Sequence, residues 1–493
     1  MIVNNWVGGT KKSDLARLGR AETTNMFVEI TDNEYAVNTV LVGMPGWESK
    51  YSIAGGTPRG IHRCINGKVF YAVGNELFCD GVKIINIAAG DSVSMCETGG
   101  HNPYLLVVDG TSMFAININD SIIDMQMNYK TIEVPNDPWE STAETAVPGK
   151  PIGIAMIYEH PMLLLKNTDR IYMGYQYPWE WTPSEYYKGE TEISNFNPDD
   201  IFMLHWKDSQ GNEMFPEGKW ISSDYSSDIA NSIVSSKGKL YVAGPKAIQA
   251  FSYIGGDFVA GDVFSCNEAS CARVGAYDNS LIDIAGSYCF VGDDGVFVDG
   301  QCVSDSFVDE AIKGKYLHVG SLGWNKHKLY VIYLTDQTIA YDLYSHTWIN
   351  LSSLNRGQMS KFRYDYCSED LALCGTAVVQ LSKNTYKEHD GTPIVKRRRG
   401  GIMMREATEM QIDRLKFISN NGQFNGNATL NVYVNGVLSE SNIVDFSTLG
   451  DYSSPFEWYD LGNGYTFEVE LLCDTDSPLS FNMLDVDAKE CVC

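Results

Sequence analysis

Acidic side chains are the most plentiful groups in this 493-residue chain that could take part in chemistry. There are 63 of them against 37 basic ones, which gives a formal net charge of −26. Glycosidases use two placed carboxylates as acid and nucleophile, but almost any pair could be drawn from so acidic a chain. The Asp-box pattern of sialidases, Ser-x-Asp-x-Gly-x-Thr-Trp, is missing. Its nearest counterpart runs from Tyr341-Asp342-Leu343 to His346-Thr347-Trp348 and is interpreted as strand packing.

The eight histidines and twelve cysteines form no recognisable metal motif. No two histidines lie four residues apart, and we identify no Cys/His cluster with the spacing of a zinc site. The close pairs Cys266 with Cys271 and Cys491 with Cys493 offer two thiols each, fewer than a four-ligand site needs. Nucleophile-elbow, phosphate-loop and dinucleotide-binding motifs are also missing. The sequence therefore predicts no catalytic residue, no metal ligand and no cofactor.

The one concentrated basic run consists of Lys396, Arg397, Arg398 and Arg399, within the segment DGTPIVKRRRGG. Such a run could contact DNA phosphates. It could instead be a solvated linker, or could pair with acidic groups on a neighbouring subunit. We expect a linker at 391–401 and keep both contacts, with DNA and with another subunit, open for the four basic residues.

A strand–turn–strand unit recurs along the chain and must position any functional group. Each copy has an apolar strand, a short polar turn and a second strand, which is typical of antiparallel hairpins. The seven copies are Val69–Gly81, Tyr104–Ile116, Met162–Gly174, Lys239–Phe251, Tyr288–Gly300, Lys328–Leu343 and Asp370–Ser382. Gly244 and Gly292 are expected in turns where the backbone takes a positive φ. The later copies recur at about 40–50 residues, the size of one propeller blade.

The predicted fold is all-β: a β-propeller of six or seven blades, followed by a small C-terminal β-sandwich-like domain. Six blades are possible because the first and last copies can share one. Four alternating segments, together with the turn signal Asn435-Gly436, predict the small domain. The expected organisation is an N-terminal segment with closing strands at 1–60, the propeller at 61–390 with insertions at 124–151 and 175–229, the linker at 391–401 and the β domain at 402–493.

Composition narrows the class of protein further. Hydrophobic residues make up 44% of the chain, close to ordinary globular usage. A net charge of −26 argues against a protein that binds nucleic acid through a broad basic surface. The sequence contains no apolar run of membrane-spanning length, and residues 1–10 lack the pattern of a secretory signal. We expect free thiols in a protein assembled in a reducing cytoplasm.

Three sets of segments resemble one family, the tail-hub or nozzle proteins of short-tailed bacteriophages, also called packaged-DNA stabilisation proteins. The similarity covers most of the chain, although none of its motifs is catalytic. The first set is Asn25–Glu29, Met44–Gly46 and Pro58–Ile61; the second is Ala247–Gly255, Ser280–Ala285, Tyr288–Gly295 and Ser306–Ile312; the third is the closing domain with Ser477-Pro478. The acidic, aromatic insertion at 175–229 and the cysteine-rich end depart from the family.

The resemblance implies a non-enzymatic virion protein, assembled in the host cytoplasm, that forms a ring, expected to be a hexamer. The ring would lie below the portal and adaptor proteins, continue the DNA channel, retain the packaged genome without tight binding, and mount tail fibres, spikes or a needle. No membrane insertion by this chain is expected. The alternative is a β-propeller that binds or cleaves host glycans, and a cytoplasmic scaffold unrelated to phages is a third possibility.

Overall fold

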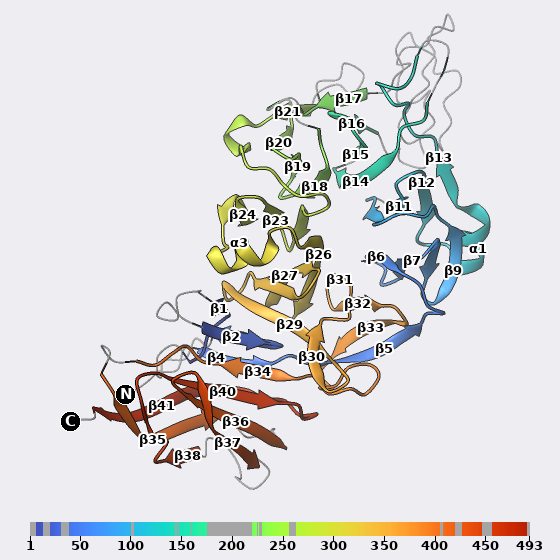
Figure 1. Ribbon diagram of the computed structural model, residues 1–493. Helices are drawn as coiled ribbons and strands as arrows, with labels where there is room; N and C mark the ends of the chain where they lie inside the picture. Colours follow the sequence, from blue (N-terminus) through green and yellow to red (C-terminus); the bar gives the residue numbers. More distant parts are fainter. Residues whose placement is uncertain are drawn as a thin grey trace, which may run out of the picture. The chain divides into compact units, whose positions relative to one another are not determined.

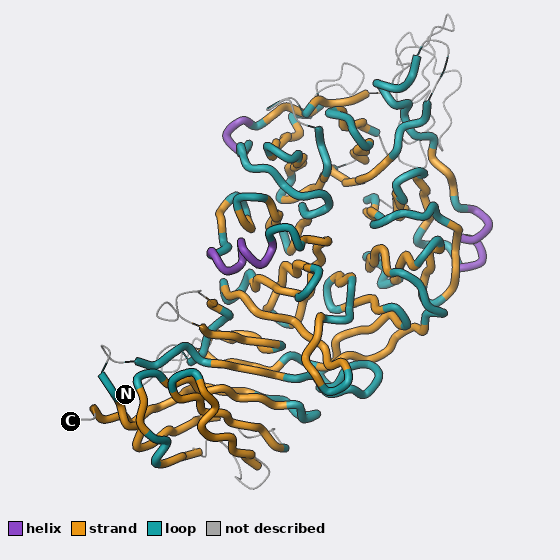
Figure 2. Tube along the Cα trace, viewed as in Figure 1, coloured by secondary structure: helices purple, strands orange, loops and turns teal. Residues whose placement is uncertain are grey.

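The protein is described here from a computed structural model, in which strands dominate (Figure 2). It divides into two compact units, one formed by Met1–Lys50 with Ser306–Cys493 and the other by Tyr51–Asp305. We call them the split unit and the continuous unit. The structure describes residues 6–12, 20–30, 39–99, 103–142, 145, 147–158, 160–174, 219–223, 225, 229–255, 263–404, 408–419, 426–445 and 456–490.

The continuous unit contains five four-stranded antiparallel sheets, one after another along the chain (Figure 1). In each sheet the strands follow their order in the sequence, so every strand pairs with the next one. The first sheet consists of β6 (Pro58–Arg63), β7 (Val69–Val73), β8 (Glu76–Cys79) and β9 (Val82–Asn86). The second consists of β10 (Ser94–Glu97), β11 (Tyr104–Val108), β12 (Met113–Asn117) and β13 (Lys130–Ile132). The third consists of β14 (Pro151–Ile157), β15 (His160–Leu165), β16 (Arg170–Met173) and β17 (Lys219–Ser222). The fourth sheet consists of β18 (Ser232–Ser236), β19 (Lys239–Ala243), β20 (Ile248–Tyr253) and β21 (Phe264–Cys266). The fifth consists of β22 (Ile282–Ile284), β23 (Ser287–Gly292), β24 (Gly295–Val298) and β25 (Gln301–Cys302).

Successive sheets of the continuous unit pack face to face through apolar side chains. One buried cluster joins the first and second sheets, with Phe70 on one side and Leu105 on the other. Equivalent clusters join the second to the third, the third to the fourth and the fourth to the fifth sheet. The first strands of neighbouring sheets are also in contact, as β6 is with β10 and β10 with β14. This is the arrangement of propeller blades.

The split unit contains two further four-stranded groups of the same kind. One runs β26 (Tyr316–Trp324), β27 (His327–Leu334), β28 (Thr338–Asp342) and β29 (Thr347–Asn355), and β30 (Gln358–Lys361) pairs with its last strand. The other runs β31 (Tyr366–Ser368), β32 (Leu371–Cys374), β33 (Ala377–Ser382) and β5 (Gly46–Ser52). An N-terminal strand thus completes the sheet built by β31–β33, and a shared core that includes Trp47 and Val331 lies between the two groups.

All seven predicted hairpins are present as the two central strands of a four-stranded sheet or group. The predicted all-β, propeller-type fold is therefore confirmed, and the described residues contain seven blade-type sheets. The prediction of a positive φ at Gly292 is wrong, because the positive φ in this turn belongs to Gly295 (118°). A Cβ atom at Gly292 would lie 2.0 Å from the carbonyl oxygen of Gly275, so close backbone approach is what requires glycine there. Gly244 does not have a positive φ either.

The split unit also holds a β-sandwich, whose core contains Leu415, Leu430 and Phe481. Asn435 and Gly436 both take positive φ in the predicted hairpin turn between β36 (Asn427–Val434) and β37 (Val437–Asp445). One sheet continues from β29 through β2 (Arg20–Thr24), β34 (Lys396–Arg399), β40 (Phe467–Cys473), β36 (Asn427–Val434) and β37 (Val437–Asp445), with β1 (Lys11–Lys12) on β2. The other orders β3 (Met26–Ile30), β4 (Thr39–Gly43), β41 (Ser480–Glu490), β35 (Met410–Ser419) and β38 (Phe456–Tyr459), with β39 (Asn463–Gly464) on β35.

The predicted boundaries around the small domain need correction, because the four N-terminal strands β1 to β4 and the expected linker are part of the sandwich sheets. The insertion at 124–151 lies between β12 and β14 and includes most of α1 (Ile122–Asn128), which is capped by Ser121. Most of the insertion at 175–229 lies outside the described residues. In the described ranges the remaining helical segments are α3 (Ser306–Ile312) and the 3-10 turn η2 (Glu268–Ser270). None of the described helices is long and apolar enough to cross a membrane.

Candidate functional site

The basic run expected to be a linker is the strand β34, which pairs with β2 on one side and β40 on the other. Alternate residues of a strand point to opposite faces. Lys396 and Arg398 are 0% and 1% exposed, whereas Arg397 and Arg399 are partly exposed. Four consecutive charges suggested a solvated segment, but pairing to two strands and alternating burial overrode that tendency.

Lys396 and Arg398 are surrounded by carbonyl oxygens. The Lys396 Nζ donates to the carbonyl oxygens of Thr475 (3.1 Å) and Ser477 (3.3 Å), and burial lowers its pKa to about 8. The Arg398 guanidinium donates to the carbonyl oxygens of Trp6 (2.7 Å) and Gly9 (3.0 Å), and burial lowers its pKa to about 10. Both side chains therefore bind the chain's own backbone.

Arg397 and Arg399 bind carboxylates of the adjacent strand and of β2. The Arg397 Nε lies 2.6 Å from Glu470 Oε1, and its Nη1 lies 3.3 Å from Glu22 Oε2. The Arg399 Nε lies 2.7 Å from Glu468 Oε2. These acidic partners belong to the same chain, so a contact of the run with DNA or a neighbouring subunit would have to compete with them.

The first two motifs behind the family resemblance also serve the backbone. Asn25 has a φ of 53°, and its amide donates to the carbonyl oxygens of Ser352 (2.9 Å) and Val395 (2.8 Å). Its Oδ1 accepts from the Ser352 N–H (3.0 Å). A Cβ atom at Gly46 would lie 2.5 Å from the carbonyl oxygen of Lys387. Both residues thus fix the contact of an N-terminal strand with the C-terminal part of the split unit.

Arg59, from the third of these motifs, has the equivalent role in the continuous unit. It is buried at the start of the first sheet. Its Nη1 donates to the carbonyl oxygens of Gly74 (2.8 Å) and Ala88 (2.6 Å), and its Nη2 reaches that of Asp109 at 3.4 Å. One side chain therefore holds two turns of the first sheet against the second sheet.

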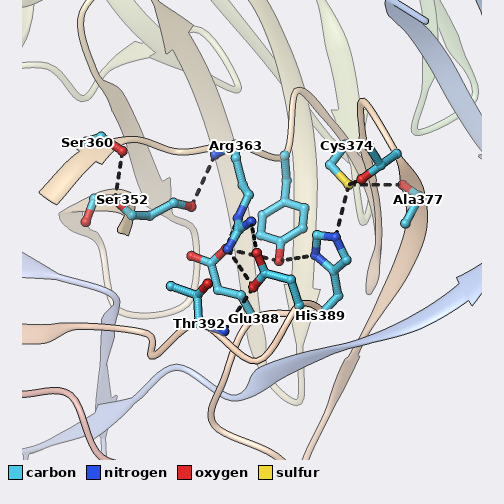
Figure 3. A network of polar contacts seen from close by, with 12 residues as sticks. Ser352, Ser360, Arg363, Cys374, Ala377, Glu388, His389 and Thr392 are labelled. Atoms are coloured by element: carbon cyan, nitrogen blue, oxygen red, sulfur yellow. Dashed lines mark hydrogen bonds and ion pairs between the residues drawn. The ribbon is translucent and has the colours of Figure 1, made fainter. Parts of the chain in front are cut away.

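Sequence reasoning missed a polar network in the split unit, shown in Figure 3. Arg363 binds Glu388 through its Nε and Asp390 through its two Nη atoms, at 2.6 and 3.0 Å. Burial raises the pKa of Glu388 despite the nearby Arg363, whereas the hydrogen bond from Arg363 lowers the pKa of Asp390. The run Lys387-Glu388-His389-Asp390 was the available signal, since four polar residues in a row follow the predicted hairpin Asp370–Ser382.

A cysteine–histidine pair at the edge of this network has the groups of a thiol nucleophile. His389 Nε2 lies 3.6 Å from Cys374 Sγ, and His389 Nδ1 lies 3.1 Å from the Tyr364 hydroxyl. Burial alone would raise the pKa of Cys374, but the bond to His389 lowers it overall, and the same thiol raises the pKa of His389. Cys374 is only 4% exposed, so a substrate could not reach its sulfur in this conformation.

Asp342, the nearest counterpart of a sialidase aspartate, is also turned inward. It is buried and lies 2.7 Å from His327 Nδ1, while His327 Nε2 lies 3.1 Å from Glu29 Oε1. It also accepts from the Ser345 hydroxyl at 2.6 Å. This supports its interpretation as a residue that holds strands and a turn together.

Comparison with known proteins yields no matching family model and no matching curated relative. Solved structures share only distant similarity. BBS1N in complex with ARL6DN is 12% identical, with a TM-score of 0.38 over 69% of this chain and 98% of that one. YCF48 bound to D1 peptide is 11% identical, with a TM-score of 0.35 over 69% and 97%. The AfRom2 CNH domain is 10% identical, with a TM-score of 0.33 over 68% and 99%. Because these scores are low, the fold assignment relies on the strand order above.

Proposed function

We propose that this chain is a structural, non-enzymatic protein of a short-tailed phage tail. Its copies would form the ring-shaped hub or nozzle below the portal and adaptor, continue the DNA channel, retain the packaged genome and mount other tail proteins. The observation that carries the proposal is the role of the motif residues Asn25, Gly46 and Arg59. They make close backbone contacts and hydrogen bonds to backbone groups, as expected where a family preserves a framework.

The inward position of the reactive groups favours a mechanical role over a catalytic one. Catalysis requires groups that reach the substrate. Among the described residues, Cys374 and Asp342 have partners suited to chemistry, yet both are buried. A structural protein of a tail needs no such access.

The net charge of the chain supports a channel through which the genome passes without tight binding. Affinity for DNA comes largely from phosphates neutralised by basic side chains. The side chains of the one concentrated basic run bind carboxylates of β2 and β40 and nearby carbonyl oxygens of the same chain. The net charge of the chain is −26. An acidic channel wall would let DNA slide past.

Strand β37 offers an edge for contact between copies. In the described part of the chain it pairs with β36 on one side and ends the sheet. It exposes Val437, Leu438 and Ile443, the last at 75%. Exposed apolar edge strands readily pair with another chain, so we assign this edge to the contact between neighbouring subunits.

Electron microscopy of the purified chain, alone and mixed with the portal and adaptor proteins of the same phage, tests the proposal. We expect closed rings that cap the portal complex. Ile443→Lys should reduce ring formation, whereas Ile123→Lys, at a similarly exposed position (71%) on α1, should leave it unchanged.

A protein that stays monomeric under all these conditions would contradict the proposal. So would turnover of a fluorogenic glycoside that a single Asp or Glu substitution abolishes. The second result would favour the alternative, a glycan-cleaving propeller.

A further inference from the structure

Three side chains of different chemistry meet where the first two sheets of the continuous unit contact each other. His62 is in β6, Cys64 directly follows that strand, and Glu97 ends β10. One ligand atom from each, a ring nitrogen, a sulfur and a carboxylate oxygen, lies within 4.8 Å of the other two.

The backbone fixes these positions. His62 and Cys64 are two residues apart, the spacing that places strand side chains on one face. The Cys64 N–H donates to the Lys68 carbonyl and the Gly67 N–H to the Cys64 carbonyl, both at 2.8 Å, which closes the turn after β6. The Ile65 N–H donates to Glu97 Oε2 at 2.9 Å and holds that carboxylate beside the turn.

The hydrogen bonds within the described chain leave the cluster incomplete. His62 Nε2 is shielded from solvent and makes no hydrogen bond to a described residue. It lies 3.7 Å from Glu97 Oε2, beyond ordinary hydrogen-bond length. Buried polar atoms usually have a partner, so an unsatisfied one calls for an explanation such as an ion.

We propose that His62 Nε2, Cys64 Sγ and a Glu97 carboxylate oxygen bind a divalent cation of the zinc type. Imidazole, thiolate and carboxylate are all zinc ligands, and the thiolate disfavours Mg²⁺ and Ca²⁺. Ligands about 2.1 Å from a tetrahedral ion lie about 3.4 Å apart, near the observed 3.7 Å between nitrogen and oxygen. Binding replaces the Cys64 S–H bond by a sulfur–metal bond and releases the proton to solvent.

Such an ion would join two sheets that otherwise meet through apolar packing and backbone-directed bonds such as those of Arg59. Two of its ligands come from the first sheet and its turn, and the third comes from the second sheet. The fourth position would be open to water or to a group of another molecule, since His62 and Glu97 are 27% and 16% exposed.

The sequence signal for this site is His62-Arg63-Cys64. It has neither the four-residue spacing of ligands on a helix nor the clustered cysteines of zinc ribbons, because ligands on a strand lie two residues apart. Glu97 could not be recognised from the sequence, because pairing of separate sheets brings it to the other two.

Titration of the chelator-treated, full-length chain with Co²⁺ tests the site, because a cobalt–thiolate bond gives a charge-transfer absorption band. We expect one Co²⁺ per chain with this band, and displacement by Zn²⁺. Cys64→Ser should abolish the band. His62→Gln and Glu97→Gln should weaken Co²⁺ binding by more than the roughly 10–100-fold typical of outer-shell changes.

The double variant Cys266→Ser, Cys271→Ser is the matched control. Those sulfurs lie 3.6 Å apart, at the end of β21 and directly after η2, and should not contribute. The proposal fails if the unaltered chain shows no band, if the band persists in Cys64→Ser, or if the control loses it. Circular dichroism checks folding, and where Cys64→Ser does not fold, unchanged Co²⁺ affinity in both His62→Gln and Glu97→Gln would equally overturn the proposal.

Discussion

The blades of the continuous unit are antiparallel, and so is the sandwich of the split unit apart from the parallel pairing of β2 with β29. The two regions differ in how far along the chain paired strands lie. In the blades each strand pairs with the next one, as β6 does with β7. In the sandwich Thr23 pairs with Arg398, and Leu41 pairs with Phe481. Closing a long loop costs entropy before its contacts form, so the sandwich depends on a few strong long-range contacts.

One buried arginine in each region illustrates the difference. Arg59 binds carbonyl oxygens that lie at most 50 residues away in the chain. Arg398 reaches the carbonyl oxygen of Trp6, 392 residues away. The first arginine reinforces a local fold, whereas the second joins segments that no local contact would bring together.

The largest effect is expected for Arg398→Ala. It leaves the carbonyl oxygens of Trp6 and Gly9 without a charged donor and opens a cavity, so the free energy of unfolding should fall by roughly 3–5 kcal/mol. Urea denaturation followed by tryptophan fluorescence measures this. Lys387→Ala, which breaks an exposed ion pair with Asp476, should cost less than about 1 kcal/mol. Equal losses in both variants would contradict the role of Arg398.

Arg59→Ala should cost about 2–4 kcal/mol, because it leaves buried carbonyl oxygens in two sheets without their donor. Its effect should be local. Hydrogen exchange should speed up in the first two sheets and leave the sandwich strands unchanged, while Arg398→Ala should speed up exchange in β2 and β34 together. Loss of protection from hydrogen exchange in β34 caused by Arg59→Ala would contradict the claim that Arg59 stabilises only its own region of the chain.

Gly292→Ala tests whether close backbone approach is what requires glycine at this position of a blade. The added Cβ atom would meet the Gly275 carbonyl oxygen at 2.0 Å, so either β23 or the loop that contains Gly275 must shift, at a cost of about 1–3 kcal/mol. Gly286→Ala, at a φ of 88° with open space around it, should cost only about 1 kcal/mol. Thermal melts compare the two, and a larger loss at Gly286 would show that backbone conformation dominates after all.

The smallest effect expected is a pH dependence that depends on Lys396. Its pKa falls from an ordinary 10.5 to about 8 on folding because the group is buried. Between those values the unfolded chain binds the proton and the folded chain does not, so the free energy of unfolding rises with pH. Relative to Lys396→Met, the natural chain should gain about 1–2 kcal/mol from neutral pH to about pH 9. Parallel stability curves would exclude a depressed pKa at Lys396.

The blades were predictable because their signals are local. In hairpins such as Lys239–Phe251, β-branched and aromatic residues indicate the strands, and Gly, Pro and Asp indicate the turns. All seven hairpins correspond to neighbouring strands of the structure. Strands of the C-terminal domain were likewise predicted, but the segment expected as a linker at 391–401 contains the strand β34, and the sequence does not show which strands share a sheet. Period-two patterns show that a strand exists and leave its partner undetermined.

The basic strand shows where such reasoning fails. Lys396–Arg399 has the composition of a solvated segment, and only its neighbours make it a buried strand. A signal existed, since Glu468 and Glu470 are spaced by two residues, as Arg397 and Arg399 are, and the two pairs meet in the sheet. That correspondence can be recognised only when the two strands are already known to be adjacent.

The place of β5 in its sheet has a consequence for how the protein is made. Ser52, at the end of β5, precedes Ser382, at the end of its partner β33, by 330 residues. At a synthesis rate of about 5–20 residues per second, roughly 15–65 s pass on the ribosome before that partner exists. The continuous unit can fold while it emerges, but β5 has to wait for its partner β33 until more than three quarters of the chain has been translated. A ribosome-associated chaperone that shields strand edges would therefore matter most for the segment synthesised first.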